Sequence, residues 1–305
     1  MMMRLRRVLF FIAIISGCSI QLDSVLLRPS QTFRLTPTNV SYAYDATTLA
    51  GANDLAVSAW YVKANGASKG CVVIIPVADA NKGRYSLLLP IFVDKGWDVV
   101  LFDYPGFGDS PGEATFDGVM QGTRTALDYA FQHHNVVVGF GVSMGGGVLA
   151  RVAVDYPLAA CIFESAGNLR EIGSDLLAYS HAPAEIGALA DMVIAANTSD
   201  DFDLKKWVQE VRVPKLFLHS PDDSLTPWER AWEIFKLAPQ PKHLVATQGD
   251  HAEQVFVDPD LYRSLVNGWL DGVLKLDPIQ VPGYQQILDD ELRATYADYG
   301  LTPKT

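Results

Sequence analysis

The sequence predicts a doubly wound α/β fold, in which a mostly parallel sheet of about eight strands carries helices on both faces. Short runs that are apolar at every position alternate along the chain with longer stretches of helical periodicity. Strands without polar alternation are typical of a parallel sheet that helices cover on both sides. With 305 residues, 49% of them hydrophobic, the chain can bury a large core. We expect one folded domain over residues 39–276.

The first two strands are expected to be antiparallel, because their residues alternate between apolar and polar. They are residues 41–44 and 56–62, and Gly51 and Asp54 mark the turn between them. Runs that are apolar on both faces predict buried strands at residues 71–75, 97–102, 136–140, 159–163 and 215–218, and a short strand follows at 244–246. Helical periodicity predicts helices at residues 85–95, 115–133, 145–156, 227–237 and 261–274.

Residues 165–203 interrupt this alternation. They contain two stretches of helical character, at residues 168–179 and 183–196, before the next strand. An insertion at this point would lie over the strand ends, where ligands bind in such sheets. A lid over the site and helices packed at the sheet edge both remain open.

The N-terminal residues 1–17 are interpreted as a signal peptide, because Arg4, Arg6 and Arg7 precede an apolar run that is too short to span a membrane. The segment Ile-Ser-Gly-Cys that ends at Cys18 resembles the lipobox of bacterial lipoproteins. This resemblance implies acylation of Cys18, for example by palmitate, and a lipid-anchored protein of the bacterial cell envelope. Ser19 resembles the pattern of lipoproteins sent to the outer membrane. Ordinary secretion and a buried first helix are the alternatives.

Two further segments lie outside the predicted domain. Residues 18–38 are polar and mixed, which suits a tether between the anchor and the folded body. Residues 277–305 form a C-terminal extension with a helical stretch at 285–299. A packed extension and a partner-binding segment both remain open for that tail.

The formal net charge of -11 argues against nucleic acid as a partner, because an acidic surface repels phosphate. Membrane attachment would therefore depend on the lipid at Cys18 and not on a basic patch. Cys71 and Cys161 lie in apolar strands, where a free cysteine behaves as a small buried hydrophobe. Strands that are not neighbours hold cysteines too far apart for a disulfide bond.

The segment Gly141-Val142-Ser143-Met144-Gly145 is the sharpest chemical signal in the chain. It lies between a predicted strand and a helix rich in small residues, which is the context of a nucleophile elbow. Glycines flank such a serine because the turn is tight and the backbone of the serine is strained. The pattern predicts that Ser143 is a nucleophile.

An activated serine needs a base and a carboxylate that orients the base, in the chain order Ser, Asp, His for this kind of fold. Asp223 follows the strand at residues 215–218, and His251 follows the strand at 244–246. Both therefore lie at the same edge of the sheet as Ser143. Asp222 is the alternative acid, and His219 is expected to pack at the strand end.

The chain resembles the α/β-hydrolase superfamily from about residue 40 to residue 274. Residues 219–227 are similar to its H-G-x-x-D-x-x-x-P segment, which puts the acid on Asp223, and Gly249-Asp250-His251 is similar to its G-x-H segment, which puts the base on His251. Residues 102–110 resemble a structural loop of the family. The resemblance implies a serine hydrolase that cleaves an ester, thioester or amide of a small acyl-bearing substrate through an acyl-enzyme, without metal or organic cofactor. Peptidase and acyltransferase activity remain open.

The oxyanion hole is where the chain departs from that family. Met144 supplies one backbone N–H, and the second should come from the loop after the strand at 71–75. The family has His-Gly there, and this chain has Pro76-Val77-Ala78-Asp79. Because proline lacks an N–H, Val77 or Ala78 must donate. The rebuilt loop favours the competing hypothesis of an envelope lipoprotein that keeps the fold as a binding or assembly module.

Overall fold

The computed structural model describes residue 23 and residues 26–178 and 184–275. Within them an eight-stranded open sheet has the order β1-β2-β4-β3-β5-β6-β7-β8. The strands are β1 (Asp45–Ala50), β2 (Ala56–Val62), β3 (Cys71–Ile75), β4 (Asp98–Phe102), β5 (Val137–Val142), β6 (Ala160–Glu164), β7 (Lys215–His219) and β8 (Lys242–Ala246). The two pairs that involve β2 are antiparallel, and the other five are parallel. The predicted fold class is confirmed.

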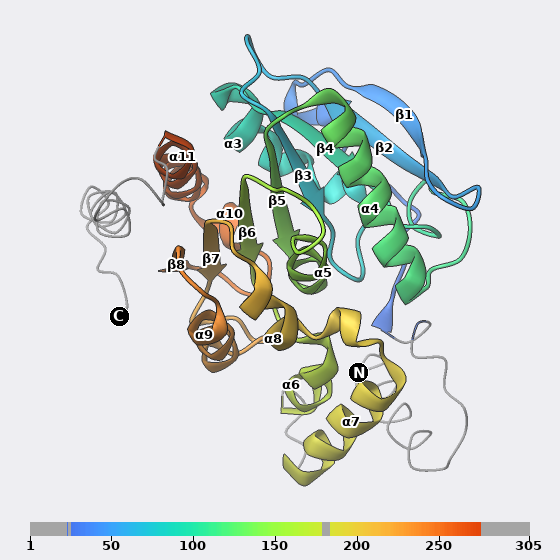
Figure 1. The fold of residues 1–305 in the computed structure, drawn as a ribbon, viewed down its shortest axis with the longest axis vertical. Coiled ribbons are helices and arrows are strands. Elements are labelled where there is room, and N and C mark those ends of the chain that lie inside the picture. Colours follow the sequence, from blue (N-terminus) through green and yellow to red (C-terminus); the bar gives the residue numbers. More distant parts are fainter. Residues whose placement is uncertain (1–22, 24–25, 179–183, 276–305) are drawn as a thin grey trace.

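Helices cover both faces of the sheet (Figure 1). One face packs against α4 (Phe116–His133), α5 (Met144–Val152), α8 (Leu204–Trp207) and α9 (Trp228–Leu237). The other face packs against α3 (Leu89–Phe92) and α11 (Pro259–Lys275). Along β3, Val73 faces the first core and its neighbour Val72 faces the second. This double burial is why the central strands are apolar at every position.

Several short helices complete the described chain. They are η1 (Pro37–Val40), η2 (Lys82–Leu88), η3 (Val93–Lys95), η4 (Leu169–Glu171), η5 (Asp200–Phe202), η6 (Val208–Glu210), α6 (Ile172–Ala178), α7 (Ala184–Asn197) and α10 (Gln254–Val257). Among the residues described, no helix is both long and apolar enough to cross a membrane.

Two local predictions were wrong. Residues 41–44 do not form a strand, because η1 ends at Ser41 in a left-handed conformation with φ of 70°, and β1 begins only at Asp45. The helix expected at residues 85–95 is divided into η2, α3 and η3. Pro90 is the second residue of α3 and supplies no backbone N–H for a continuous helix through that point.

Part of the predicted tether lies on the body of the protein. We call residues 26–36 the strap. Leu27 is buried in the core, and the N–H of Arg28 donates to the carbonyl of Ala78 at 2.8 Å. The side chain of Asn81 donates to the carbonyls of Ser30 and Thr32, at 3.2 and 2.9 Å. Residues 26–38 therefore do not behave as a free tether, whereas Cys18, the predicted signal peptide and the C-terminal extension lie outside the described residues.

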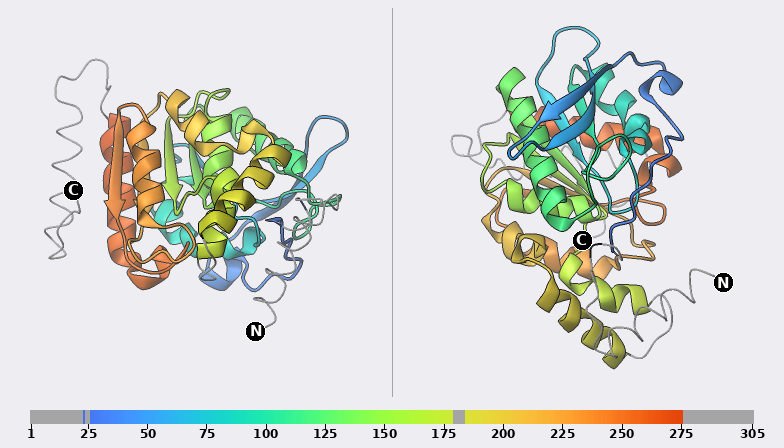
Figure 2. Two further views of the ribbon diagram at one scale, coloured as in Figure 1. Left: turned by 90° about the horizontal axis from the view of Figure 1, so that it is seen from below. Right: turned by 90° about the vertical axis from the view of Figure 1, so that its right-hand side faces the viewer.

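The insertion predicted at residues 165–203 forms η4, α6, α7 and η5, and residues 179–183 fall outside the description. Helices α6 and α7 lie beyond the carboxyl ends of β5 and β6 (Figure 1). Figure 2 shows the same helices projecting from the body of the molecule. A salt bridge between Arg230 and Asp175, with a distance of 3.2 Å, ties α6 to α9.

Candidate active site

Ser143 lies in the turn between β5 and α5, where its backbone has φ of 53° and ψ of -117°. The turn packs so closely against the end of β3 that a Cβ atom at Gly145 would meet the carbonyl oxygen of Ile75 at 2.2 Å. A Cβ atom at Gly141 would meet the carbonyl oxygen of Gly145 at 2.5 Å. Both glycines of the motif are therefore required by space, and the strained serine is held at the carboxyl edge of the sheet.

A continuous chain of hydrogen bonds joins the three predicted side chains. Nε2 of His251 lies 2.8 Å from Oγ of Ser143. Nδ1 of His251 lies 3.0 and 2.9 Å from the two carboxylate oxygens of Asp223. This is the geometry of a nucleophile, a base and an orienting acid.

The Asp223 carboxylate is inaccessible to solvent but well supplied with donors. Its Oδ1 accepts hydrogen bonds from the N–H groups of Leu225 and Thr226, at 3.0 and 2.8 Å. Burial alone would raise the pKa of Asp223, but the hydrogen bond and charge of His251 and the Thr226 N–H outweigh burial and lower it. Asp223 is therefore ionised when it faces His251.

The loops that carry the acid and the base are tied together. The Asp250 carboxylate accepts hydrogen bonds from the N–H of Ser224 at 2.8 Å and from the N–H of His251 at 2.7 Å. Behind His251, the N–H of Ala252 donates to Oγ of Ser165 at 3.1 Å. These contacts fix the position of His251 relative to Asp223 and to the end of β6.

The two candidates for the second oxyanion donor differ in the structure. The N–H of Val77 donates to the hydroxyl of Tyr85 at 2.7 Å and is thus already engaged. Within the described residues, nothing accepts a hydrogen bond from the N–H of Ala78. Ala78 and Met144 both line the cavity above Ser143, so Ala78 is the remaining candidate for the second oxyanion donor.

A cavity of about 280 Å³ opens onto Ser143 and His251. Its apolar wall includes Leu26 of the strap and Ile172 of α6. The strap and the insertion therefore both contribute to the cavity, and its volume suits a modest acyl group.

The other candidates weighed from the sequence do not take part in this chain of hydrogen bonds. Asp222 is exposed, and Asp223 alone contacts the base. His219 packs at the end of β7, where its Nε2 lies 2.8 Å from the carbonyl of Thr226. Cys71 and Cys161 are buried and free, as predicted.

Three site residues carried no signal in the sequence. Tyr85 holds the oxyanion loop, and Arg84 lines the cavity and donates to the carbonyl of Ala252 at 2.9 Å. Glu164 is buried beneath the elbow, where it accepts a hydrogen bond from the hydroxyl of Tyr262 at 2.7 Å. Burial raises the pKa of Glu164 from 4.5 to about 7. Their roles depend on contacts between distant parts of the chain, so no local motif could reveal them.

Sequence comparisons connect this site with known proteins. The pattern of the family described as serine aminopeptidase, S33, matches residues 66–172. The chain is also similar to the uncharacterized protein YfhR of Salmonella typhimurium, with 27% identity over 210 residues that cover 64% of this chain and 70% of that protein.

Two solved structures are similar in fold. The esterase Pf2001 of Pyrococcus furiosus superposes with a TM-score of 0.69 at 16% identity and covers 82% of this chain and 98% of its own. The alpha/beta hydrolase GrgF from Penicillium sp. sh18 has a TM-score of 0.59 at 18% identity and covers 76% and 98%. The sheet is therefore that of the α/β-hydrolase fold.

Proposed function

We propose that this protein is a serine hydrolase of esterase type that cleaves an ester, thioester or amide through an acyl-enzyme. The observation that carries the proposal is the unbroken chain of hydrogen bonds from Ser143 through His251 to Asp223. A binding module has no physical need for this arrangement at a strained elbow. The likeness to solved esterases supports the same choice.

In the proposed mechanism, Nε2 of His251 removes the proton of Ser143 as Oγ attacks the acyl carbon. Asp223 holds the imidazole in the required tautomer and stabilises its cation. The oxyanion accepts hydrogen bonds from the N–H groups of Met144 and Ala78. The imidazolium then gives its proton to the leaving alcohol, thiol or amine. Water, activated by His251, attacks the acyl-enzyme and restores Ser143.

The test is covalent labelling of the full chain, in a mild detergent, with a fluorophosphonate probe. We expect the wild type to be labelled and Ser143→Ala and His251→Ala to be unlabelled. Ser199→Ala is the matched control, because Ser199 caps a short helix outside the cavity. A folded wild type that is not labelled would contradict the hydrolase and favour a binding or assembly module.

We further propose that the reaction takes place at the bacterial cell envelope, with the protein anchored by a lipid on Cys18. The basic start and short apolar run before Cys18 support this proposal. Labelled palmitate should be incorporated into the wild type and not into Cys18→Ala. Incorporation that persists in the variant would exclude the anchor.

A further inference from the structure

A second cavity, of about 440 Å³, adjoins the cavity of Ser143. The two cavities share Asp79, Arg84 and Glu253 in their linings, so a ligand can extend from one into the other. The second cavity is closed on one side by the strap, which contributes Arg34. Its apolar part is formed by Leu35, Leu87 and Phe256.

The arginines of this region differ from the others in the described chain. Arg28, Arg34 and Arg84 have no carboxylate within salt-bridge distance there, and all three line one or both cavities. Every other arginine of residues 26–178 and 184–275 forms a salt bridge with a carboxylate; these are Arg124, Arg151, Arg170, Arg212, Arg230 and Arg263. Although carboxylates are abundant in a protein with a net charge of -11, the three arginines without a carboxylate partner all lie around these two cavities.

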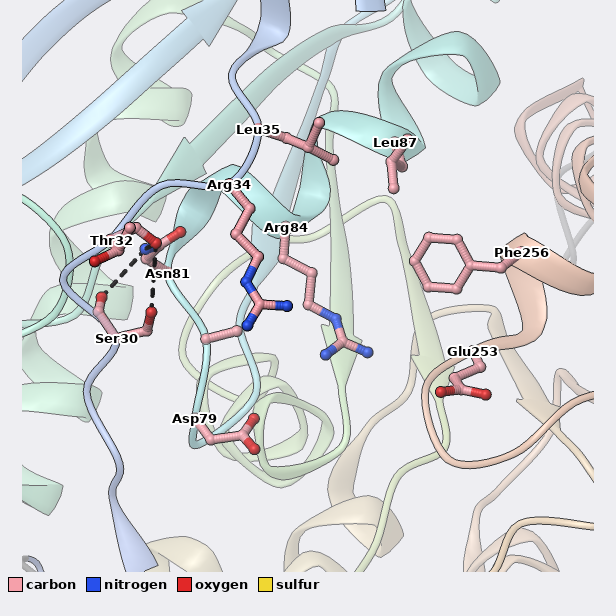
Figure 3. A pocket seen from close by; sticks show the side chains of 11 residues that line it. Ser30, Thr32, Arg34, Leu35, Asp79, Asn81, Arg84, Leu87, Glu253 and Phe256 are labelled. Carbon is pink, nitrogen blue, oxygen red and sulfur yellow. Dashed lines mark hydrogen bonds between the residues drawn. The ribbon is translucent and has the colours of Figure 1, made fainter. Parts of the chain in front are cut away.

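Figure 3 shows the side chains of Arg34 and Arg84 extending into the second cavity, toward the part lined by Asp79 and Glu253. Arg84 is oriented by its hydrogen bond to the carbonyl of Ala252, 2.9 Å away. Arg34 follows Thr32, whose carbonyl is held by Asn81 at 2.9 Å. Both guanidinium groups therefore come from anchored segments and keep donors available to a ligand.

Resting on the proposed hydrolase function, we propose that Arg34 and Arg84 bind an anionic group, a carboxylate or a phosphate, of the substrate whose acyl carbon lies at Ser143. Guanidinium groups match both anions because they offer paired N–H donors in a fixed plane. The proposed substrate class is an ester with an anionic group a short distance from the bond that is cleaved.

Arg34→Gln tests the proposal, because Arg34 is exposed and lies outside the cavity of Ser143. The kcat/KM of the full-length protein is measured for two pairs of esters. One pair is p-nitrophenyl butanoate and mono-p-nitrophenyl glutarate, and the other is 1-butanoylglycerol and its 3-phosphate. For one pair or both, the kcat/KM of the anionic ester divided by that of the neutral ester should fall at least about tenfold in Arg34→Gln. The reason is that a charged hydrogen bond to the anionic group is lost. The pair that responds identifies the anion.

Arg34→Lys should restore part of the ratio. Arg212→Gln is the control, because Arg212 is paired with Glu210 and does not line either cavity, and it should leave the ratio unchanged. Calorimetric titration with glutarate and with glycerol 3-phosphate gives a readout without catalysis, and Arg34→Gln should weaken binding about tenfold. Binding that depends on Arg34 without any hydrolysis would support the anion site and contradict the hydrolase. Unchanged ratios in an active enzyme, or no binding of either anion, would overturn the anion site.

Discussion

The Asp250 carboxylate accepts hydrogen bonds from both the backbone N–H and the hydroxyl of Ser224, at 2.8 and 3.0 Å. It also accepts the N–H of His251 at 2.7 Å. Ser224 follows the acid Asp223, so a single exposed carboxylate joins the loop of the acid to the loop of the base. We therefore expect the alignment of Asp223 with His251 to depend on Asp250.

Asp250→Ala should therefore lower kcat about tenfold with little change in KM, because the base loses its alignment while the cavity stays intact. Asp250→Asn keeps one acceptor oxygen and should recover part of the loss. Asp222→Ala is the control, because the Asp222 side chain is exposed and makes no contact with the base. Full activity of Asp250→Ala in steady-state hydrolysis of p-nitrophenyl butanoate would show that the two loops are positioned without this contact.

The central sheet and the three side chains of the candidate triad could be predicted from the sequence for a physical reason. Strands buried on both faces cannot carry polar residues, so they appear as apolar runs such as residues 71–75. The elbow could also be predicted from the sequence, since a Cβ atom at Gly141 or Gly145 would meet a backbone oxygen at 2.5 or 2.2 Å and only glycine fits. Constraints that act on consecutive residues, such as burial of a strand or a tight turn, can be recognised as short patterns in the sequence.

Features that depend on distant contacts were missed. The strap is mixed in composition, and its packing on the body is shown by the core position of Leu27 and by the hydrogen bonds from Asn81. The acceptor of the Val77 N–H is the hydroxyl of Tyr85, which no motif around Val77 could indicate. Position 41 was expected in a strand, but the cap of η1 at Ser41 decided its conformation.

Gly145→Ala should be strongly destabilising, because a Cβ atom would meet the backbone oxygen of Ile75 at 2.2 Å. We expect the free energy of unfolding in urea to fall by about 3 kcal/mol or more. Gly147 lies in the same helix, α5, and a Cβ atom there would meet nothing closer than 3.9 Å. Gly147→Ala should stay within about 1 kcal/mol of the wild type or gain stability. Equal losses in both variants would contradict the tight packing of the elbow.

Tyr85→Phe should leave the buried N–H of Val77 without an acceptor. The expected cost is about 1–3 kcal/mol in the free energy of unfolding, with slower labelling of Ser143 by the fluorophosphonate because the oxyanion loop is less well held. Tyr42→Phe also removes one hydroxyl, which donates to Asp94 at 2.9 Å near the surface. Ser143 of the control Tyr42→Phe should be labelled at the wild-type rate. If Ser143 of Tyr85→Phe were labelled at the wild-type rate, the hydroxyl of Tyr85 would not be needed to position the oxyanion loop for the reaction.

Glu164 should make the stability of the fold depend on pH. Burial raises its pKa from 4.5 to about 7, so the folded chain binds this proton more tightly than the unfolded chain. The contribution of Glu164 to stability is therefore fully present below pH 4.5 and is lost as the pH rises to about 7. Glu164→Gln stays neutral and keeps an oxygen that can accept the hydrogen bond from Tyr262. Relative to the wild type, its free energy of unfolding in urea should be higher at pH 8 than at pH 5 by roughly 1–3 kcal/mol.

The control for this pH effect is Glu229→Gln, because Glu229 is an exposed carboxylate at the start of α9. The difference in the free energy of unfolding between Glu229→Gln and the wild type should be the same at pH 5 and pH 8, since folding leaves the Glu229 carboxyl group exposed to solvent. The difference in the free energy of unfolding between Glu164→Gln and the wild type could also be the same at pH 5 and pH 8. This result would mean that Glu164 is already ionised in the folded chain at pH 5. In that case the hydrogen bond from Tyr262 and the charges of Arg84 and His251, which lower the pKa of Glu164, would outweigh burial. A measured difference that grows with pH would instead establish a neutral carboxyl group beneath the nucleophile at pH 5.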